Sequence, residues 1–285
     1  MAAPTIAVTG STGALGGMLA QRLADAGVAQ RLLARTPSRA PELPGAEVHP
    51  FSYSDREASA RALDGIETLF MVSASESEAR LEQHRTFIDT AAAAGVRHVV
   101  YTSFAAAAPD AIFTLARDHF ITEEYLKASG MAWTMLRDNF YQDVMELFAG
   151  DDGVIRGPAG DGRVSLVARA DVARVAASIL TDPAAHAGQT YDLTGPEALT
   201  LAEVAATIAR VRGTEASYYD ETLEEAYASR APYGAPDWQV DAWVSTYTAI
   251  ASNALAPVSG DVERVTGTAP MTFEAYLRST PAPRR

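Results

Sequence analysis

A glycine-rich turn near the N-terminus constrains the fold of this chain most. Residues 5–8 form a short apolar run, and residues 14–26 carry leucines at the spacing of an amphipathic helix. Between them lie glycines at positions 10, 13 and 16, which permit a tight turn, close approach of main-chain N–H groups to a phosphate, and close helix–strand packing. The segment predicts that the unpaired N–H groups at the start of the helix bind the diphosphate of a dinucleotide. The predicted contacts are Gly10, Ser11, Thr12, Gly13, Ala14, Leu15 and Gly16.

The pattern that follows this turn predicts a parallel sheet. Strand patterns near 4–9, 29–34, 46–51, 67–73, 97–102 and 131–136 alternate with helix patterns near 14–26, 55–63, 76–94, 113–129 and 139–149. Alternation of this kind favours right-handed crossovers between parallel strands. We therefore expect an α/β fold with a doubly wound parallel sheet of the Rossmann type, followed by a smaller, mostly helical C-terminal domain.

The character of the sequence changes after residue 150. Clusters of turn residues surround short strands up to residue 163, whereas a helix at 170–181 and a strand at 189–194 are expected to return to the main sheet. Thr200 and Glu203 predict a capping box at the start of another helix. We predict a nucleotide-binding domain of residues 1–150, with 164–195 returning to its sheet, and a substrate-binding domain of residues 196–285 together with 151–163.

Charge and composition exclude several classes of partner. The net charge of −13 over 285 residues argues against nucleic acid and against an anionic membrane surface. No apolar run approaches the roughly 18 residues of a membrane span, and the N-terminus lacks the pattern of a signal peptide. The absence of cysteine excludes disulfides, thiolate metal sites and a cysteine nucleophile. We expect a cytoplasmic monomer or homodimer that acts on a small molecule and has no metal site.

The second predicted strand indicates which dinucleotide is bound. Sites selective for NAD place a carboxylate about 20 residues beyond the glycines, where it accepts a hydrogen bond from the ribose 2′-hydroxyl. Here no acidic residue ends the strand, and Arg35 lies 19 residues beyond Gly16. A guanidinium at this place can bind a 2′-phosphate, so we predict NADP(H), with NADPH preferred over NADH. Arg39 is a second candidate on the same loop, and a solvated loop arginine is the alternative interpretation.

The ends of the other strands complete the predicted site, because ligands of open α/β sheets lie beyond the carboxyl edge. Cofactor contacts are expected after the third, fourth and fifth strands, and substrate contacts after the fifth and sixth. Ser54 has the alternative role of a helix N-cap. The cofactor candidates are Tyr53, Ser54, Ser73, Ala74, Ser75, Thr102 and Ser103, and the substrate candidates are Phe104, Asp138, Asn139, Phe140 and Tyr141.

The proton-donor pair Tyr-x-x-x-Lys of short-chain reductases is impossible in this chain. Its one lysine is Lys127, and Glu123 lies four residues before it. On the same predicted helix His119 and Glu123 are four residues apart and can face the same way. We predict that this pair is catalytic, with His119 supplying a proton as hydride arrives or hydrogen-bonding the substrate. The alternatives are a surface histidine with a salt-bridge partner and a histidine that only shapes the pocket.

Together these residues resemble the NmrA-like atypical short-chain dehydrogenases/reductases, and among them the NADPH-dependent quinone oxidoreductases and triphenylmethane reductases. The resemblance covers most of residues 5–195, and residues 266–277 look like the closing helix of the family. The marks are residues 8–16, 33–35, 83–84, 94–98, 101–103 and 136–138, together with His119 and Glu123. The family implies NADPH in the glycine cleft and a small C-terminal domain over the nicotinamide. One departure is Asp138, where members of this type often carry asparagine.

The resemblance predicts an NADPH-dependent oxidoreductase that transfers hydride to a quinone or a similar conjugated carbonyl acceptor, a planar or aromatic molecule. Such an acceptor can take its proton from solvent. One alternative is a non-catalytic NADP(H)-sensing regulatory protein. Another is a biosynthetic ketone reductase or dehydratase in which Asp138 and His119 act as acid and base. Five C-terminal aromatic residues are candidates for a wall against a planar substrate, with a core role as the alternative: Tyr218, Tyr219, Tyr227, Trp238 and Trp243.

Overall fold

The structure, a computed structural model, describes residues 3–282 in two compact units. Unit 1 comprises the chain up to Phe104 together with Asp118–Arg137 and Arg169–Tyr191. Unit 2 comprises Ala105–Arg117, Asp138–Ala168 and the chain from Asp192 on. Residues 105–117, 138–150, 164–168 and 192–195 therefore fall in unit 2, whereas the sequence predicted them as part of the nucleotide-binding domain.

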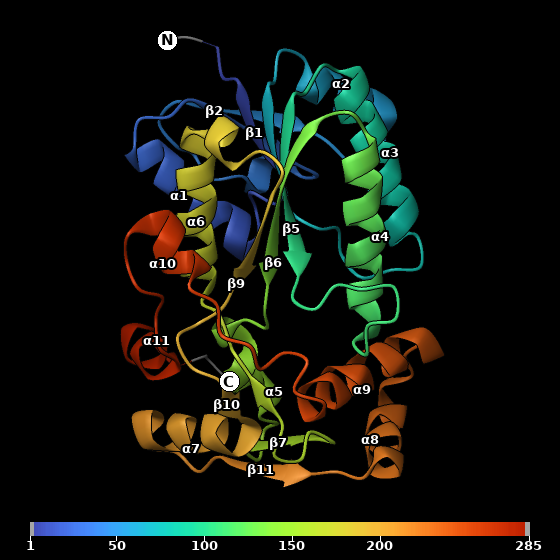
Figure 1. Cartoon of the computed structure of the whole chain (residues 1–285), viewed down its shortest axis with the longest axis vertical. Helices are drawn as coiled ribbons and strands as arrows, with labels where there is room; N and C mark the ends of the chain where they lie inside the picture. The colour runs from blue at the N-terminus through green and yellow to red at the C-terminus, as the bar shows by residue number, and fades with distance from the viewer. Residues whose placement is uncertain (1–2, 283–285) are drawn as a thin grey trace. The chain divides into compact units, whose positions relative to one another are not determined.

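Unit 1 is built on a seven-stranded sheet with the strand order β3-β2-β1-β4-β5-β6-β9 (Figure 1). Its strands are β1 (Ile6–Val8), β2 (Gln30–Ala34), β3 (Ala46–Pro50), β4 (Thr68–Met71), β5 (His98–Phe104), β6 (Ala132–Asp138) and β9 (Gln189–Leu193). β1 pairs in parallel with β2 on one side and with β4 on the other, so that Val8 lies opposite both Leu32 and Phe70. The strand order reverses between β1 and β4, and ligands of such sheets bind beyond the strand ends at that point. The predicted doubly wound α/β fold is confirmed.

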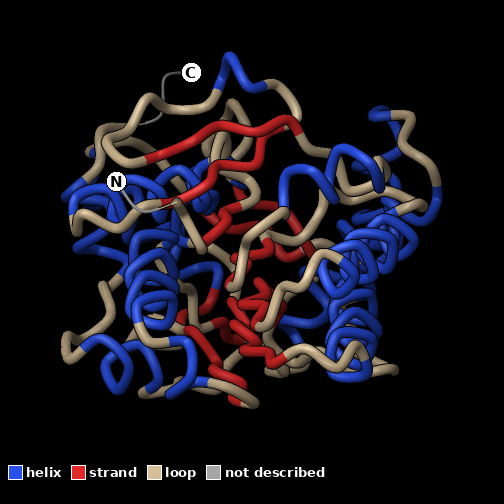
Figure 2. Tube along the Cα trace, turned by 90° about the horizontal axis from the view of Figure 1, so that it is seen from above, coloured by secondary structure: helices blue, strands red, loops and turns tan. Residues whose placement is uncertain are grey.

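Helices cover both faces of this sheet, as Figures 1 and 2 show. α1 (Ala14–Asp25) and α6 (Arg169–Thr181) lie side by side on one face. α2 (Arg56–Leu63), α3 (Arg80–Ala93) and α4 (Thr114–Ala128) lie on the other. The alternation of strands and helices read from the sequence thus corresponds to real crossovers.

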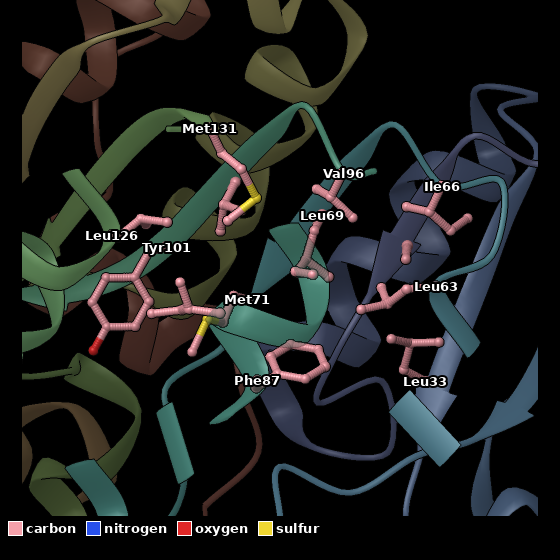
Figure 3. Packing of buried hydrophobic residues seen from close by; sticks show 14 of the residues in the cluster. Leu33, Leu63, Ile66, Leu69, Met71, Phe87, Val96, Tyr101, Leu126 and Met131 are labelled. Atoms are coloured by element: carbon pink, nitrogen blue, oxygen red, sulfur yellow. The ribbon is translucent and has the colours of Figure 1, made fainter. Parts of the chain in front are cut away.

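An apolar cluster in unit 1 fixes α3 against the sheet (Figure 3). Phe87 of α3 is fully buried, and its ring centroid lies 5.0 Å from that of Phe51 and 4.9 Å from that of Tyr53. Leu69 and Met71 of β4 belong to the same cluster. Burying one large apolar side chain stabilises a fold by about 1.5–3 kcal/mol, so this cluster holds the inner face of α3 in one orientation. The polar residues on that face are positioned as a consequence.

Two predicted helices differ from the observed ones. The helix expected at 76–94 begins only at Arg80, whose N–H donates to the Ser77 carbonyl in a preceding turn. The helix expected at 139–149 is wrong over residues 139–141. There the Phe140 carbonyl accepts from the Val167 N–H at 3.0 Å, and this pairing with a distant segment replaces helical hydrogen bonds. Only η2 (Gln142–Val144) and α5 (Met145–Phe148) remain helical.

Unit 2 is mostly helical, with two small pairs of strands. β7 (Val154–Gly157) pairs in parallel with β11 (Ser217–Asp220), and β8 (Arg163–Val164) pairs antiparallel with β10 (Leu199–Thr200). The predicted capping box is confirmed, because the Thr200 side chain accepts from the Glu203 N–H and the Glu203 carboxylate accepts from the Thr200 N–H. The remaining helices are α7 (Leu201–Arg212), α8 (Leu223–Arg230), η4 (Ala231–Tyr233), α9 (Asp237–Ala251), α10 (Asp261–Thr266) and α11 (Phe273–Ser279).

The helices of the described chain are short compared with a bilayer. The α-helices α4 and α9 have 15 residues each, whereas a membrane-spanning helix needs about 20. Within residues 3–282, no helix is both long enough and apolar enough to cross a membrane. In the same range, no three histidine or acidic side chains gather as ligands for a metal ion.

Candidate functional site

The glycine turn between β1 and α1 has the geometry that the sequence predicts. Gly10 adopts a positive φ of 65°, and a Cβ atom at Gly16 would lie 2.3 Å from the Gly10 carbonyl oxygen. Only glycine fits at Gly16, because real side-chain atoms do not approach a carbonyl so closely. Gly13 is the N-cap of α1 and provides no side-chain hydrogen bond. The first N–H groups of α1 therefore have no side-chain cap and favour an anion.

Some of the residues predicted to contact the diphosphate are exposed in this turn, and others are buried. Thr12, Gly13 and Ala14 are exposed, whereas Ser11 and Leu15 are buried. The Ser11 hydroxyl lies 3.5 Å from the Leu33 carbonyl oxygen of β2, and Leu15 belongs to the buried face of α1. The exposed backbone at 12–14 is thus the part of the turn that a diphosphate can reach.

Tyr53 stabilises the glycine turn through hydrogen bonds of its hydroxyl group. Its hydroxyl donates to the Val72 carbonyl at the end of β4 and lies 3.1 Å from Thr9 Oγ1. Thr9 Oγ1 in turn accepts from the Val72 N–H at 2.8 Å. Burial raises the pKa of the Tyr53 hydroxyl well above its ordinary value. The hydroxyl is committed to the protein, so a contact of Tyr53 with adenine would have to come from its ring.

Ser54 follows Tyr53 in the loop after β3. Ser54 is exposed, and its hydroxyl lies 3.4 Å from that of Ser52. The alternative role of Ser54 as a helix N-cap is wrong, because Asp55 caps α2 by accepting from the Ala58 N–H at 2.9 Å. A role of Ser54 at the cofactor stays a prediction.

Arg35 directly follows β2, beside the turn. Its side chain and that of Arg39 are both exposed. Within residues 3–282, neither guanidinium forms a hydrogen bond or an ion pair with another side chain. Arg35 lies close enough to Tyr53 to act on the ionisation of its hydroxyl. A free cation at the end of β2 is what recognition of a 2′-phosphate requires.

The loop after β4 is held by side chains from two other elements. The Ser73 N–H donates to Thr102 Oγ1 at 2.8 Å, and the Ala74 N–H donates to His84 Nε2 at 2.9 Å. Ser75, the third predicted contact, is exposed. Thr102 therefore fixes the loop with its side chain, and the loop presents backbone and small side chains at the switch point.

His84 is a positioning residue that the sequence analysis did not assign. Its Nε2 atom accepts from Ala74, so its proton is on Nδ1, which lies 2.8 Å from Thr122 Oγ1. The Thr122 hydroxyl in turn donates a hydrogen bond to the Asp118 carbonyl. Burial and the charge of Arg80 lower the pKa of His84 to about 3. The available signal was the spacing of Arg80, His84 and Phe87, which places all three on one face of α3.

His119 is buried and held in one tautomer. Its Nε2 atom lies 3.1 Å from Arg80 Nη2, and it must be the acceptor because a guanidinium only donates. The proton is therefore on Nδ1, 3.0 Å from the Tyr101 hydroxyl. Burial, together with the charge of Arg80, holds the pKa of His119 well below its usual range. These contacts exclude the surface interpretation and favour a neutral, positioning imidazole; proton donation by His119 stays a prediction.

Arg80 was likewise missed. Its side chain is 5% exposed, and its closest carboxylate oxygen, Oδ2 of Asp118, lies 3.9 Å away. Its Nε and Nη1 atoms are buried without a hydrogen-bond partner among the described residues. A buried cation with so weak a counterion makes this part of the sheet edge electropositive, which suits an anionic ligand.

Glu123 forms a buried ion pair with Arg137. Its carboxylate accepts from Arg137 Nε at 2.9 Å and from Arg137 Nη2 at 2.7 Å, and the Ser103 hydroxyl donates to it at 2.5 Å. Along α4, His119 and Glu123 are about 6 Å apart, because each helical residue rises about 1.5 Å. Their partners Tyr101 and Ser103 are two residues apart on β5, which is a similar spacing of about 6.7 Å. The predicted common face of His119 and Glu123 thus packs on β5. All carboxylate contacts are structural, and a catalytic role of Glu123 stays a prediction.

The predicted substrate residues are divided between the two units. In unit 1, the Phe104 ring lies 6.1 Å from that of His119. In unit 2, the Tyr141 hydroxyl donates to Asp138 at 2.5 Å, and the Phe140 ring lies 5.3 Å from that of Phe113. The Asn139 amide donates to Ser165 Oγ and to the Leu255 carbonyl, both at 2.9 Å. Asn139 is thus committed to the fold of unit 2, and contact of these residues with a substrate stays a prediction.

Comparison with known proteins shows what this chain is similar to. Residues 10–183 match the model of the NAD(P)H-binding family. The chain is 35% identical to quinone oxidoreductase 2 of Escherichia coli over 243 residues, which is 83% of this chain and 84% of that protein. It is 31% identical to the NAD(P)H azoreductase of Xenophilus azovorans, over 96% of this chain and 97% of that protein. The crystal structure of an NADPH-dependent quinone oxidoreductase of Escherichia coli with NADPH superposes with a TM-score of 0.88 at 31% identity, over 96% of this chain and 99% of that one.

Proposed function

Because the chain belongs to the NAD(P)H-binding family, we propose that it is an NADPH-dependent oxidoreductase that transfers hydride to a quinone or a similar conjugated carbonyl acceptor. Family membership confirms the resemblance predicted from the sequence. The quinone oxidoreductase and azoreductase relatives support reduction by a nicotinamide nucleotide. The acceptors for which these relatives are named, a quinone and an azo compound, support a conjugated acceptor for this chain.

The observation that carries this proposal is the glycine turn. The residues present fit a dinucleotide, because a Cβ atom at Gly16 would collide with the Gly10 carbonyl and the start of α1 has no side-chain cap. Thr102 and His84 hold the backbone of the loop after β4 beside the same switch point. Two backbone segments are thus fixed in advance of binding, which lowers the entropic cost of ordering them around a ligand.

The unpaired guanidinium of Arg35 supports NADPH over NADH. Its charge has no carboxylate partner in the described chain, so binding a 2′-phosphate would not break an existing ion pair. A hydrogen bond to a charged group contributes about 1.5–3 kcal/mol, which corresponds to roughly 10- to 150-fold in affinity. NADH lacks the 2′-phosphate, so its affinity should not increase through Arg35.

The chain's residues would act by binding and orienting, and bound NADPH would supply the hydride. His119 directs its N–H to Tyr101 and accepts from Arg80 with its other ring nitrogen, which supports a positioning role. The Glu123 carboxylate is occupied by Ser103 and Arg137. A reduced quinone can be protonated by solvent, so the reaction needs no acid from the protein.

Two measurements on purified protein test the proposal. Titration calorimetry with NADPH and NADH should show tighter binding of NADPH. Loss of NADPH absorbance in the presence of 1,4-naphthoquinone should be continuous and should saturate with the quinone. Tight NADPH binding without turnover across a panel of quinones would contradict the enzyme proposal and favour the alternative of a regulatory protein.

A further inference from the structure

We propose that unit 2 contains a binding site for an uncharged, planar aromatic molecule. The site is a cavity of about 490 Å³ lined by parts of α5, β7, η4 and α9. Four aromatic side chains line it: Phe148, Tyr233, Trp243 and Tyr247. Pockets for small molecules commonly measure about 300–1,000 Å³ and are lined by apolar and aromatic groups, so the size and lining fit a ligand of one or two fused rings.

One wall of this cavity is rigid because Tyr247 is fixed on several sides. A Cβ atom at Gly157 would lie 2.1 Å from the Tyr247 ring, so the ring occupies the space that any other residue at 157 would fill. The Arg230 guanidinium lies 5.0 Å from the centre of the same ring, and the Phe148 ring lies 6.2 Å away. A ring held in this way offers a prearranged surface for another planar group, with little entropy lost on binding.

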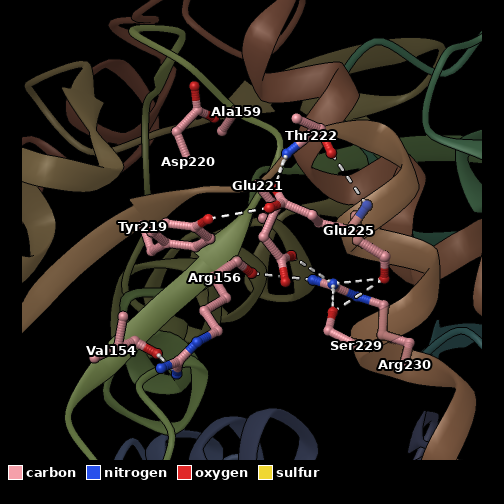
Figure 4. Close-up of polar contacts among 12 residues, drawn as sticks. Val154, Arg156, Ala159, Tyr219, Asp220, Glu221, Thr222, Glu225, Ser229 and Arg230 are labelled. Atoms are coloured by element: carbon pink, nitrogen blue, oxygen red, sulfur yellow. Dashed lines mark hydrogen bonds and ion pairs between the residues drawn. The ribbon is translucent and has the colours of Figure 1, made fainter.

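The charges of the lining cancel in pairs. Arg230 donates to the Glu221 carboxylate at 2.8 Å and to the Arg156 carbonyl at 3.0 Å. The Arg156 side chain extends away from Arg230 toward Val154 (Figure 4). Its guanidinium donates to Asp152 Oδ2 at 2.5 Å. Each guanidinium therefore already has a carboxylate partner. An anionic ligand would have to compete with Asp152 or Glu221, whereas an uncharged ligand meets a neutral surface.

The opening of the cavity exposes apolar surface. Tyr233 is 74% exposed and Leu147 is 68% exposed, and the Tyr233 ring contacts that of Trp243 edge-on at 5.9 Å. Exposed aromatic and aliphatic groups around a concave site are typical of ligand-binding surfaces. A planar molecule that enters the cavity would cover both Tyr233 and Trp243. Binding here requires no step of the proposed reaction and no NADPH.

Two probes with the same ring system test the charge argument: 1,4-naphthoquinone and 1,4-naphthoquinone-2-sulfonate. The chain has no cysteine, so a quinone finds no thiol to alkylate. The indole N–H signals of the three tryptophans are followed by NMR without NADPH, and Trp243→Phe identifies the signal of Trp243. We expect the uncharged quinone to shift that signal in a saturable way and the sulfonate to bind at least 5-fold more weakly. A sulfonate that binds equally well would overturn the charge argument.

Tyr233→Ala is the decisive variant, because Tyr233 is so exposed that its loss should not unfold the protein. It should weaken the quinone by about 3- to 10-fold, the usual range for one aromatic contact. Of the aromatic residues predicted to form a wall against a planar substrate, Trp243 lines this cavity and Tyr219 does not. Tyr219→Ala is therefore the matched control: Tyr219 is 49% exposed, and its loss should leave the affinity unchanged. Equal affinities of wild type and Tyr233→Ala, or an unmoved Trp243 signal, would overturn the site.

The outcome is separable from that of the proposed function. Wild-type protein that oxidises NADPH with the quinone but shows no Trp243 response would overturn this site and leave the enzyme proposal intact. A saturable Trp243 response in protein that binds no NADPH would support this site and contradict the proposed function.

Discussion

Replacing Glu123 with glutamine tests whether this carboxylate is structural. The side chain has no exposed surface and accepts hydrogen bonds from Ser103 and, through two nitrogens, from Arg137. Removing one partner of a buried ion pair costs about 3–5 kcal/mol. Arg137 is 24% exposed and can recover some hydration, so we expect about 2–3 kcal/mol, at or below the lower end of that range. For a chain of this size the melting temperature should fall by roughly 3–5 °C.

The adjacent glutamate provides the matched control. Glu124 is 52% exposed and pairs with Lys127 at 2.8 Å on the helix surface. Glu124→Gln should therefore cost less than about 1 kcal/mol. Both variants are compared by urea denaturation followed by circular dichroism, and kcat is normalised to folded protein. The reasoning is refuted if Glu123→Gln is as stable as Glu124→Gln, and equally if stability holds while kcat falls a hundredfold.

Three further predictions concern the cofactor edge. Arg35→Ala should weaken NADPH by about 10-fold or more and leave NADH nearly unchanged, whereas equal effects on the two nucleotides in calorimetry would contradict the assignment. Arg39→Ala tests the second candidate on the same loop, and a larger loss of NADPH affinity there than in Arg35→Ala would also contradict it. The pKa of His84 is lowered to about 3 in the folded protein, so the unfolded chain binds a proton there more readily than the folded protein does. The contribution of neutral His84 to the free energy of unfolding should therefore be complete above about pH 6.5. Between about pH 6.5 and pH 3 it should fall by about 1.4 kcal/mol per pH unit. His84→Asn should flatten this slope in urea titrations at pH 7, 6 and 5, and an unchanged slope would show that His84 is not the titrating group. Tyr53→Phe leaves the Val72 carbonyl without its donor and should lower stability by about 1–2 kcal/mol, so a melting temperature equal to that of the wild type would count against the supporting role.

The glycine turn was predictable because its requirements are local. A positive φ at Gly10 and the close approach at Gly16 depend on residues within one short segment, and both leave a direct mark in the sequence. The parallel sheet was predictable from the alternation of helices and strands, because that pattern favours right-handed crossovers. The position of Arg35 at the end of the second strand was predictable because it lies 19 residues beyond Gly16 in the sequence.

The polar cluster behind the turn was not predictable in the same way. Arg80 and His119 are 39 residues apart, and only the packing of α3 and α4 on the sheet brings them within 3.1 Å. The sequence pattern showed that His119 and Glu123 share a helix face, but not that this face is buried against β5. The missing helix at 139–141 has a similar origin, since its backbone pairs with Val167 rather than with itself.

Calorimetric titration of folded protein with NADPH, in parallel with Gly16→Ala, tests the central claim most directly. The added Cβ atom would lie 2.3 Å from the Gly10 carbonyl oxygen and must displace the backbone that faces the diphosphate. The account predicts saturable, one-to-one binding to the wild type and at least tenfold weaker binding to Gly16→Ala at comparable helix content. Absence of binding to well-folded wild-type protein, or equal affinities of the two proteins, would contradict it.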